Sequence, residues 1–387
     1  MIVRSVALEH FRNYTALEAA FSPGVNVIYG ENAQGKTNLL EAVAYLSTAS
    51  SHRARYDREL IQMGEEAALV RAGLLSRDRD FTLEARLRRG QRRQLSSNGV
   101  RLKSAGELSG ILNTVLFCPE DLSLIRAGAA ERRRFLDGCI SQLRPRYAAA
   151  LAEYRRLYEH KTRILRDWTE KPSLLETLDE FSLAMARAGA VLIHYRAHFI
   201  RRLRDVVPPI HADFSGGREA LGLWYATVST VTDPEAPARD ILPQLLEHQR
   251  THRQAELDAR QCLTGPHKDD LLVDLDGMEA KTYASQGQTR TAALSLKLGC
   301  REIFFQDTGE WPVLLLDDVL SELDHRRQAF VLNRIGGGQV FITCCEEDRL
   351  SGLEEGAVFH IQGGGWSEAG SGPFLWGATT PARHPPV

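Results

Sequence analysis

The chain has 387 residues, of which 43% are hydrophobic and 25% are charged, as in an ordinary globular protein large enough for one large or two moderate domains. Its formal net charge of −2 excludes a general attraction to polyanions, so any nucleic-acid contact must come from local basic patches. The apolar runs are all too short to span a bilayer, and we expect no contact with a membrane.

The cysteines and the first residues indicate the compartment. Six cysteines form no C-x-x-C pair, and Cys344 and Cys345 are adjacent, which suits neither a zinc site nor an ordinary disulfide. Scattered free thiols in a protein of this size are typical of a reducing compartment. The start, MIVRSVALEHFRNY, includes Arg4 and Glu9 and lacks the apolar core of a signal peptide. We therefore expect a cytoplasmic protein.

Residues 25–46 have the pattern of a strand, a glycine-rich loop and a helix. The apolar run VNVIY precedes GENAQGKT, which matches G-x-x-x-x-G-K-[ST]. The glycines allow backbone amides to turn toward phosphate oxygens, the lysine reaches the β- and γ-phosphates, and the threonine hydroxyl binds Mg²⁺. The pattern predicts an ATP site formed by Gly30, Glu31, Asn32, Ala33, Gln34, Gly35, Lys36, Thr37 and Asn38.

Strand patterns continue to about residue 118. ALVRAGLL, FTLEARL and NTVLFC are typical strands, and Asn98-Gly99 is a hairpin turn. No acidic residue lies between Leu87 and Lys103, so basic residues on these hairpins could neutralise DNA phosphates without reading bases. Each of them could equally be a solvated turn residue. The candidate DNA contacts are Arg88, Arg89, Arg92, Arg93, Arg101 and Lys103.

The pattern becomes helical from Glu120 to about Val207. Two long amphipathic stretches separated by Lys171-Pro172 predict an antiparallel helical hairpin, and Pro208-Pro209 predicts its end. A strand, LGLWYATVS, and a helix through HQRTHRQAELDARQ follow. Residues 132–134 are a second basic cluster, which neighbouring acidic residues offset.

An α/β pattern returns from residue 262. The strand PVLLLD has an apolar run suited to burial on both faces, and it ends at Asp317 and Asp318. In P-loop NTPases the first such carboxylate holds Mg²⁺, and the next one can orient and deprotonate the attacking water. We therefore assign Lys36, Asp317 and Asp318 to catalysis, and Thr37 and Asp317 to the metal.

A helix start before this strand completes the ATP motifs. Ser285, Gln286, Gly287 and Gln288 resemble the S-x-G-Q signature of ABC-type ATPases. Serine is a favourable N-cap, and free amides at a helix start attract a γ-phosphate. In SELD, Ser321 and Asp324 occupy the place of the D-loop.

These patterns predict an α/β protein, an ABC-type ATPase domain with a helical insertion lobe. Residues 1–118 and 262–362 would form the ATPase domain, and residues 119–261 the helical lobe. The tail, residues 363–387, is rich in glycine and proline and is predicted to be disordered.

Six stretches together resemble the RecF family of bacterial recombination mediators, in the SMC and Rad50-like branch of the ABC ATPases. They are HFRNY, GENAQGKTNLLEA, FCPEDLSLIRAGAAERRRFLD, TGPHKDDL, SQGQTRTAALSLKLG and VLLLDDVLSELD, between residues 10 and 324. HFRNY and TGPHKDDL make the resemblance specific because they are not general NTPase motifs. Ala130 departs from the family, which commonly has proline there.

The resemblance implies a weak, DNA-stimulated ATPase that forms a homodimer on ATP, each signature capping the other subunit's nucleotide. It implies binding to double-stranded and gapped DNA and loading of RecA recombinase with RecR and RecO, in repair, replication-fork maintenance and the SOS response. It places Arg12 and Asn13 near the nucleotide base or ribose. It leaves open the Q-loop, the γ-phosphate sensor and the role of TGPHKDDL, which we expect to support the site or relay between lobes.

Two other functions share the ATP motifs. An ABC transporter subunit would need a membrane-coupling surface and usually a switch histidine, where this chain has Thr343. An overcoming-lysogenization-type nuclease would carry an acidic metal-binding domain after the ATPase, where this chain has the Gly/Pro-rich tail. The RecF-like function is therefore the leading hypothesis.

Overall fold

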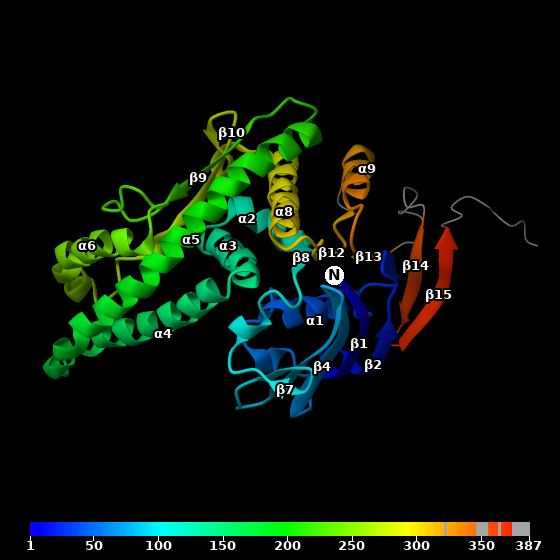
Figure 1. The fold of residues 1–387 in the computed structure, drawn as a ribbon, viewed down its shortest axis with the longest axis horizontal. Coiled ribbons are helices and arrows are strands. Elements are labelled where there is room, and N and C mark those ends of the chain that lie inside the picture. Colours follow the sequence, from blue (N-terminus) through cyan, green and yellow to red (C-terminus); the bar gives the residue numbers. More distant parts are fainter. Residues whose placement is uncertain (321–322, 346–354, 363–364, 374–387) are drawn as a thin grey trace, which may run out of the picture. The chain divides into compact units, whose positions relative to one another are not determined.

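The computed structural model describes residues 1–320, 323–345, 355–362 and 365–373. The chain forms two compact units (Figure 1). Unit 1 comprises Met1–Arg101, Thr114–Pro119 and the chain from Trp311 onward, and unit 2 comprises Leu102–Asn113 and Glu120–Glu310. Among the helices in these ranges, none is both long and apolar enough to cross a membrane.

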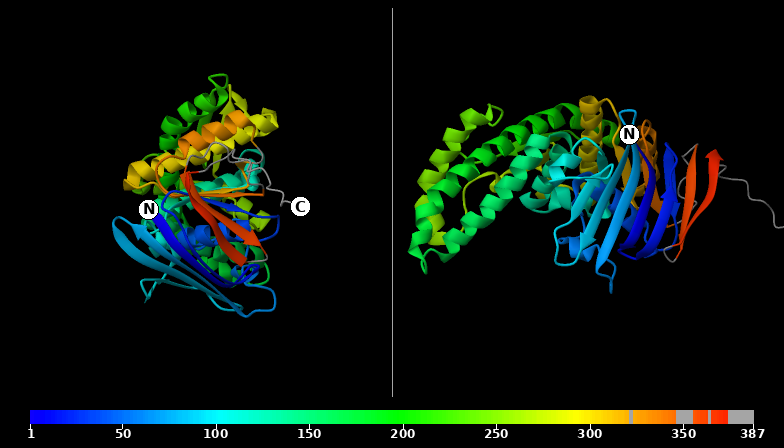
Figure 2. Two further views of the ribbon diagram at one scale, coloured as in Figure 1. Left: turned by 90° about the vertical axis from the view of Figure 1, so that its right-hand side faces the viewer. Right: turned by 60° about the horizontal axis from the view of Figure 1, so that its bottom comes forward.

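Unit 1 contains two six-stranded sheets. The first is antiparallel in the order β2-β1-β4-β5-β6-β7, and its long strands lie side by side in Figure 2. The second has the order β15-β14-β3-β13-β12-β8 and is parallel from β14 to β8. The strands are β1 Ile2–Phe11, β2 Tyr14–Ala20, β3 Val25–Tyr29, β4 Ala67–Ser76, β5 Arg79–Arg88, β6 Gln94–Ser97, β7 Val100–Arg101, β8 Thr114–Phe117, β12 Val313–Asp317, β13 Val340–Cys344, β14 Glu355–Gln362 and β15 Gly365–Pro373.

Helix α1, Lys36–Thr48, lies between the two sheets. It contacts β4 and β5 of the first sheet and β8, β12 and β13 of the second, and its Leu39, Leu40 and Val43 are buried. Strands β3, β12 and β13 are parallel, so their carboxyl ends share one edge. The glycine-rich loop after β3 therefore meets Asp317, which ends β12, and Asp318, which follows it, at that edge. The short helices η1, Asp57–Glu59, and α9, His325–Arg334, also belong to this unit.

Unit 2 is mainly helical, with one three-stranded antiparallel sheet of order β11-β10-β9. Helices α4 and α5 pack along each other as the predicted hairpin (Figure 1). The break between them contains Pro172. The elements are η2 Ala105–Leu108, α2 Leu122–Arg126, α3 Ala129–Leu143, α4 Pro145–Asp167, η4 Pro172–Leu174, α5 Leu175–Ser215, β9 Leu221–Ala226, α6 Ala238–Ala259, η5 Pro266–Lys268, β10 Asp270–Leu275, β11 Met278–Glu279, α7 Ala280–Tyr283 and α8 Gln286–Thr308; η3, Pro119–Asp121, precedes α2 at the unit boundary.

The predicted end of the hairpin at Pro208-Pro209 is wrong. Helix α5 continues to Ser215 and ends at Gly216, whose φ of 66° is left-handed. Proline removes a backbone donor and normally ends a helix, but Val207, Ile210 and Phe214 around the two prolines are buried. The burial of these side chains offsets the lost hydrogen bonds, so the helix persists.

The boundary predicted at residue 262 lies instead at Glu310. Strand β10 pairs with β9, and α8 packs against α5. Leu296 of α8 and Val207 of α5 belong to one hydrophobic core. The signature helix is therefore part of the helical unit rather than of the unit that carries the glycine-rich loop.

Part of the tail predicted to be disordered is a strand. Strand β15 pairs antiparallel with β14. The Trp366 ring stacks on Phe359 with centroids 4.5 Å apart and meets Phe21 edge-on at 5.5 Å. This aromatic contact and the paired backbone compensate for the glycine-rich composition of the strand. Residues 374–387 lie outside the described residues.

Candidate functional site

The loop between β3 and α1 contains two positions that only glycine fits. Gly30 and Gly35 have φ values of 153° and 117°. A Cβ on Gly35 would lie 2.7 Å from the Tyr14 hydroxyl oxygen, and a Cβ on Gly30 would overlap the carbonyl oxygen of Ile361. The bare backbone of this loop, followed by the N-terminus of α1, has the form of a phosphate-binding cradle.

Side chains of the HFRNY segment form hydrogen bonds with the backbone of this loop. The Tyr14 hydroxyl donates to the Gly35 carbonyl at 3.0 Å, and Asn13 Nδ2 donates to the Gln34 carbonyl at 3.0 Å. Asn38 Nδ2 donates in turn to Asn13 Oδ1 at 2.8 Å. The segment predicted to lie near the base or ribose thus fixes the loop backbone, a role of Tyr14 that the sequence pattern did not single out.

The Arg12 side chain forms an ion pair with a residue of α1. Its guanidinium forms a bidentate pair with the Glu41 carboxylate, at 2.8 and 2.7 Å. Glu41 is fully buried. Burial alone would raise the pKa of Glu41, but hydrogen bonds from Arg12 and Ser51 and the Arg12 charge outweigh it, and the pKa lies below its ordinary value. The pair therefore anchors the β1–β2 turn to the helix that follows the loop.

Lys36 lies over the loop. Its Nζ donates to the carbonyls of Gly30 and Glu31 at 2.5 and 2.8 Å, and its side chain is buried. The Cys345 thiol lies 3.8 Å from the same ammonium and donates to Asn32 Oδ1 at 2.9 Å. These contacts hold a positive charge beside the cradle, where phosphate oxygens could replace the loop carbonyls as acceptors.

The start of α1 and the ends of β12 and β13 bring oxygen ligands together. Asp317 Oδ1 accepts a hydrogen bond from the Thr37 hydroxyl at 2.9 Å and another from the Thr343 hydroxyl at 2.8 Å. The Thr343 oxygen also accepts the Asp318 amide hydrogen at 2.9 Å. Asp318 itself has a left-handed φ of 51°, which costs about 1 kcal/mol for a non-glycine residue. The adjacent Thr37 and Asp317 oxygens form a donor set that suits Mg²⁺.

The signature turn begins helix α8 in unit 2. The Ser285 side chain accepts from the Gln288 amide at 3.3 Å, while Gln288 Oε1 accepts from the Ser285 amide at 2.8 Å. This capping box leaves Ser285 and Gln286 exposed. Of the predicted D-loop residues, Asp324 caps α9 by accepting from the Arg327 amide at 2.9 Å, and Ser321 lies outside the described residues.

The six candidate DNA contacts are not equivalent. Arg88, Arg89, Arg92 and Arg101 are exposed in unit 1, and Lys103 is exposed in unit 2. Arg93 differs because its guanidinium bonds to the Tyr45 hydroxyl at 3.2 Å, to Asp57 at 3.2 Å and to the Ala49 carbonyl. Arg93 is thereby held against α1 and Asp57 with its side chain 36% exposed, and its assignment as a DNA contact stays a prediction.

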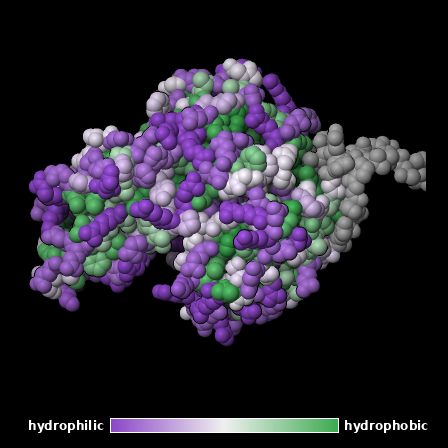
Figure 3. All heavy atoms as spheres, viewed as in Figure 1, coloured by the Kyte–Doolittle hydropathy of each residue, from purple (hydrophilic) through white to green (hydrophobic). Residues whose placement is uncertain are grey.

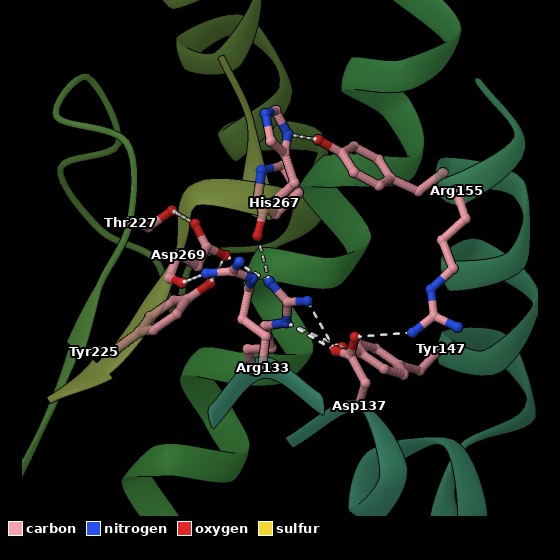
Figure 4. Close-up of polar contacts among 11 residues, drawn as sticks. Arg133, Asp137, Tyr147, Arg155, Tyr225, Thr227, His267 and Asp269 are labelled. Atoms are coloured by element: carbon pink, nitrogen blue, oxygen red, sulfur yellow. Dashed lines mark hydrogen bonds and ion pairs between the residues drawn. The ribbon is translucent and has the colours of Figure 1, made fainter. Parts of the chain in front are cut away.

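The TGPHKDDL segment lies in a buried polar network within unit 2 (Figure 4). The Asp269 carboxylate accepts from Arg196 at 2.9 Å, from Thr227 at 2.7 Å and from the Tyr225 hydroxyl. Arg196 also pairs with Asp137 at 2.8 Å. Burial raises the pKa of Asp269, although Arg196 and the hydroxyl donors oppose the change. The segment thus ties α3, α5 and β9 together, as buried charges require partners.

His267 in the same segment is neutral. The Tyr154 hydroxyl lies 2.7 Å from Nδ1, and Nε2 lies 3.1 Å from the Cys262 carbonyl oxygen. The carbonyl can only accept, so Nε2 carries the proton and Nδ1 accepts from Tyr154. Burial lowers the pKa of His267 to about 4. Tyr154 and Cys262 both belong to unit 2, and these contacts indicate a structural role rather than catalysis.

Comparison with known proteins relates most of the chain to one family. The family model described as RecF/RecN/SMC N terminal domain matches residues 2–363. The DNA replication and repair protein RecF of Agathobacter rectalis is 40% identical over 364 residues, covering 93% of this chain and 97% of that protein. The protein of the same name from Lachnospira eligens is 40% identical over 357 residues, covering 92% and 94%.

Solved structures of the same family and of a related fold also superpose on this chain. The recombination mediator protein RecF in complex with ATPrS, from the RecFOR pathway, superposes with a TM-score of 0.87 at 33% identity, covering 95% of this chain and 98% of that one. An Smc head domain from Pyrococcus furiosus has a TM-score of 0.54 at 16% identity, covering 95% of both chains. The second likeness shows the fold alone and confirms the predicted ABC-type head.

Proposed function

Because the chain belongs to the RecF family of DNA replication and repair proteins, we propose that it is an ATP-dependent DNA-binding clamp. It dimerises on ATP and helps to load RecA recombinase at single-strand gaps, with RecR and RecO as partners, in the bacterial cytoplasm. The family match over residues 2–363 supports this function over a transporter subunit or an overcoming-lysogenization-type nuclease.

The proposed nucleotide chemistry follows from the cluster in unit 1. Loop amides from Gly30 to Gly35 bind the phosphates, and Lys36 neutralises the β- and γ-phosphates. Thr37 and Asp317 would hold Mg²⁺, which supplies charge neutralisation on the phosphates. Asp318 orients and deprotonates the attacking water. Its side chain is one methylene shorter than the glutamate common in ABC pumps, so we expect a weak ATPase. The family resemblance implies that DNA stimulates it.

The observation that carries the clamp proposal is the exposed, capped start of α8. Ser285 and Gln286 are exposed. The Gln288 amide is capped by the Ser285 side chain, whereas helix geometry gives the Gln286 and Gly287 amides of this 23-residue helix no acceptor four residues earlier in the helix. Such a turn can bind a γ-phosphate presented by a second copy in a two-fold dimer. ATP would then bridge the two subunits through its γ-phosphate, which ADP lacks. A nucleotide shifts the monomer–dimer equilibrium only if it binds the two states with different affinity, and the γ-phosphate supplies that difference.

The test is sizing by analytical ultracentrifugation with ATP, with ADP and without nucleotide. The Ser285→Arg variant should bind ATP as the wild type does, because the loop is intact, but should form no ATP-dependent dimer. Ser173→Arg, an exposed serine of η4 in the same unit, is the matched control and should dimerise normally. Equal dimer fractions for wild type and Ser285→Arg at equal ATP occupancy would refute the clamp.

A further inference from the structure

Two basic segments that are distant in the sequence meet in unit 1. The first is segment 52–58, which carries Arg53, Arg55 and Arg58, and the second is segment 88–93. Arg93 of the second segment pairs with Asp57 of the first at 3.2 Å. The same guanidinium bonds to α1 through the Tyr45 hydroxyl at 3.2 Å. Arg93 and Asp57 thus join the two segments into one surface.

An exposed aromatic side chain stands in the first segment. Tyr56 is 48% exposed. Exposed residues on the face that Figure 3 draws are mostly hydrophilic. The guanidinium carbons of Arg55 and Arg58 lie 5.3 and 4.8 Å from the centroid of the Tyr56 ring, within cation–π range. Both arginines are exposed at their side chains, so they can bind other groups without leaving a buried partner unpaired.

Asp57 in this segment and Glu59 directly after it form hydrogen bonds with other groups. Asp57 accepts from the Tyr45 hydroxyl at 2.9 Å as well as from Arg93. Glu59 accepts the Arg55 amide hydrogen at 2.9 Å, and its own amide donates to the Tyr56 carbonyl at 3.0 Å. These bonds fix the turn that presents Tyr56, and they leave the ring flanked by positive charge.

We propose that Tyr56, Arg55 and Arg58 form a contact for an unpaired DNA base and its neighbouring phosphates, a site that rests on the proposed DNA-binding function. Aromatic rings stack on bases of any sequence, and guanidinium groups bind phosphate oxygens in bidentate geometry. The exposed Arg88, Arg89 and Arg92 of the joined segment contact the adjoining backbone through its charge.

This chemistry predicts that the surface binds gapped DNA more tightly than intact duplex DNA. Bases in an intact duplex are stacked on one another and do not reach a tyrosine on a protein surface, whereas bases in a gap are free to stack on it. The arginines bind phosphates in both kinds of DNA. The tyrosine therefore adds affinity for gapped DNA alone, and the basic residues add affinity for both.

The experiment compares a duplex with the same duplex interrupted by a short gap that contains 2-aminopurine. Fluorescence anisotropy gives the two affinities, and the 2-aminopurine signal reports stacking. Tyr56→Ala should weaken binding to gapped DNA roughly ten-fold or more, lose the stacking signal and leave duplex affinity unchanged. Tyr56→Phe should behave as the wild type, because the ring is kept. Met63→Ala, at an exposed residue of the same unit, is the control and should have no effect.

Two other results have distinct meanings. Equal binding of gapped DNA by wild type and Tyr56→Ala, with an unchanged 2-aminopurine signal, would overturn the base contact while leaving the DNA clamp intact. A wild type that binds neither DNA at low salt, but binds a poly-glutamate peptide through Arg55 and Arg58, would reject the proposed DNA function and assign the surface to an acidic protein segment.

Discussion

Thr343 offers a direct test of how the site is organised. Its buried hydroxyl donates to the Asp317 carboxylate and accepts the Asp318 amide hydrogen, at 2.8 and 2.9 Å. Strand register puts Thr343 beside Asp317 on the neighbouring parallel strand. One hydroxyl therefore holds both the proposed metal ligand and the left-handed backbone of the residue proposed to activate water.

Thr343→Val removes this hydroxyl while keeping the shape of the side chain. A hydrogen bond to a charged group contributes about 1.5–3 kcal/mol. If the transition state loses that much stabilisation because the Asp317 carboxylate is no longer held in place, kcat falls roughly 10- to 100-fold, since each ~1.4 kcal/mol is a factor of ten. ATP affinity should change little, because the loop amides and Lys36 bind the phosphates. Thr343→Ser keeps the hydroxyl and should retain most of the wild-type kcat.

The assay is steady-state phosphate release together with equilibrium binding of a fluorescent ATP analogue. Thermal unfolding of each variant separates a folding defect from a catalytic one. A Thr343→Val protein that is folded, binds ATP and hydrolyses it at the wild-type rate would refute the positioning role. A Thr343→Ser protein as slow as Thr343→Val would show that the hydroxyl is not sufficient by itself and that the methyl group is needed as well.

Two further variants test the role of Asp317 and of the buried His267. Asp317→Asn should keep ATP affinity but abolish turnover by weakening metal binding, and a normal phosphate-release rate would contradict its assignment. Burial lowers the pKa of His267 to about 4, so its contribution to the free energy of unfolding is complete above pH ~6.5 and falls by about 2 kcal/mol on acidification to pH ~5. Urea unfolding of His267→Gln should lack this part of the pH dependence; an unchanged dependence would contradict it.

Local patterns were sufficient for the parts of the site that depend on neighbouring residues. The loop motif fixes where Gly30, Gly35 and Lys36 lie, because a strand, a tight turn and a helix start are set by short-range sterics and hydrogen bonds. The apolar run before Asp317 indicated a strand buried on both faces, and β12 is buried throughout. Ser285 with Gln288 three residues later is likewise a local capping signal.

Contacts between distant segments required the tertiary structure. Only the register of β12 and β13 brings Thr343 to Asp317, and only the packing of segment 52–58 on segment 88–93 brings Arg93 to Asp57. The end of α5, the placement of α8 in unit 2 and strand β15 also differed from their sequence patterns. In each case long-range burial or pairing decided the outcome, and composition and spacing carry no information about which distant partner supplies it.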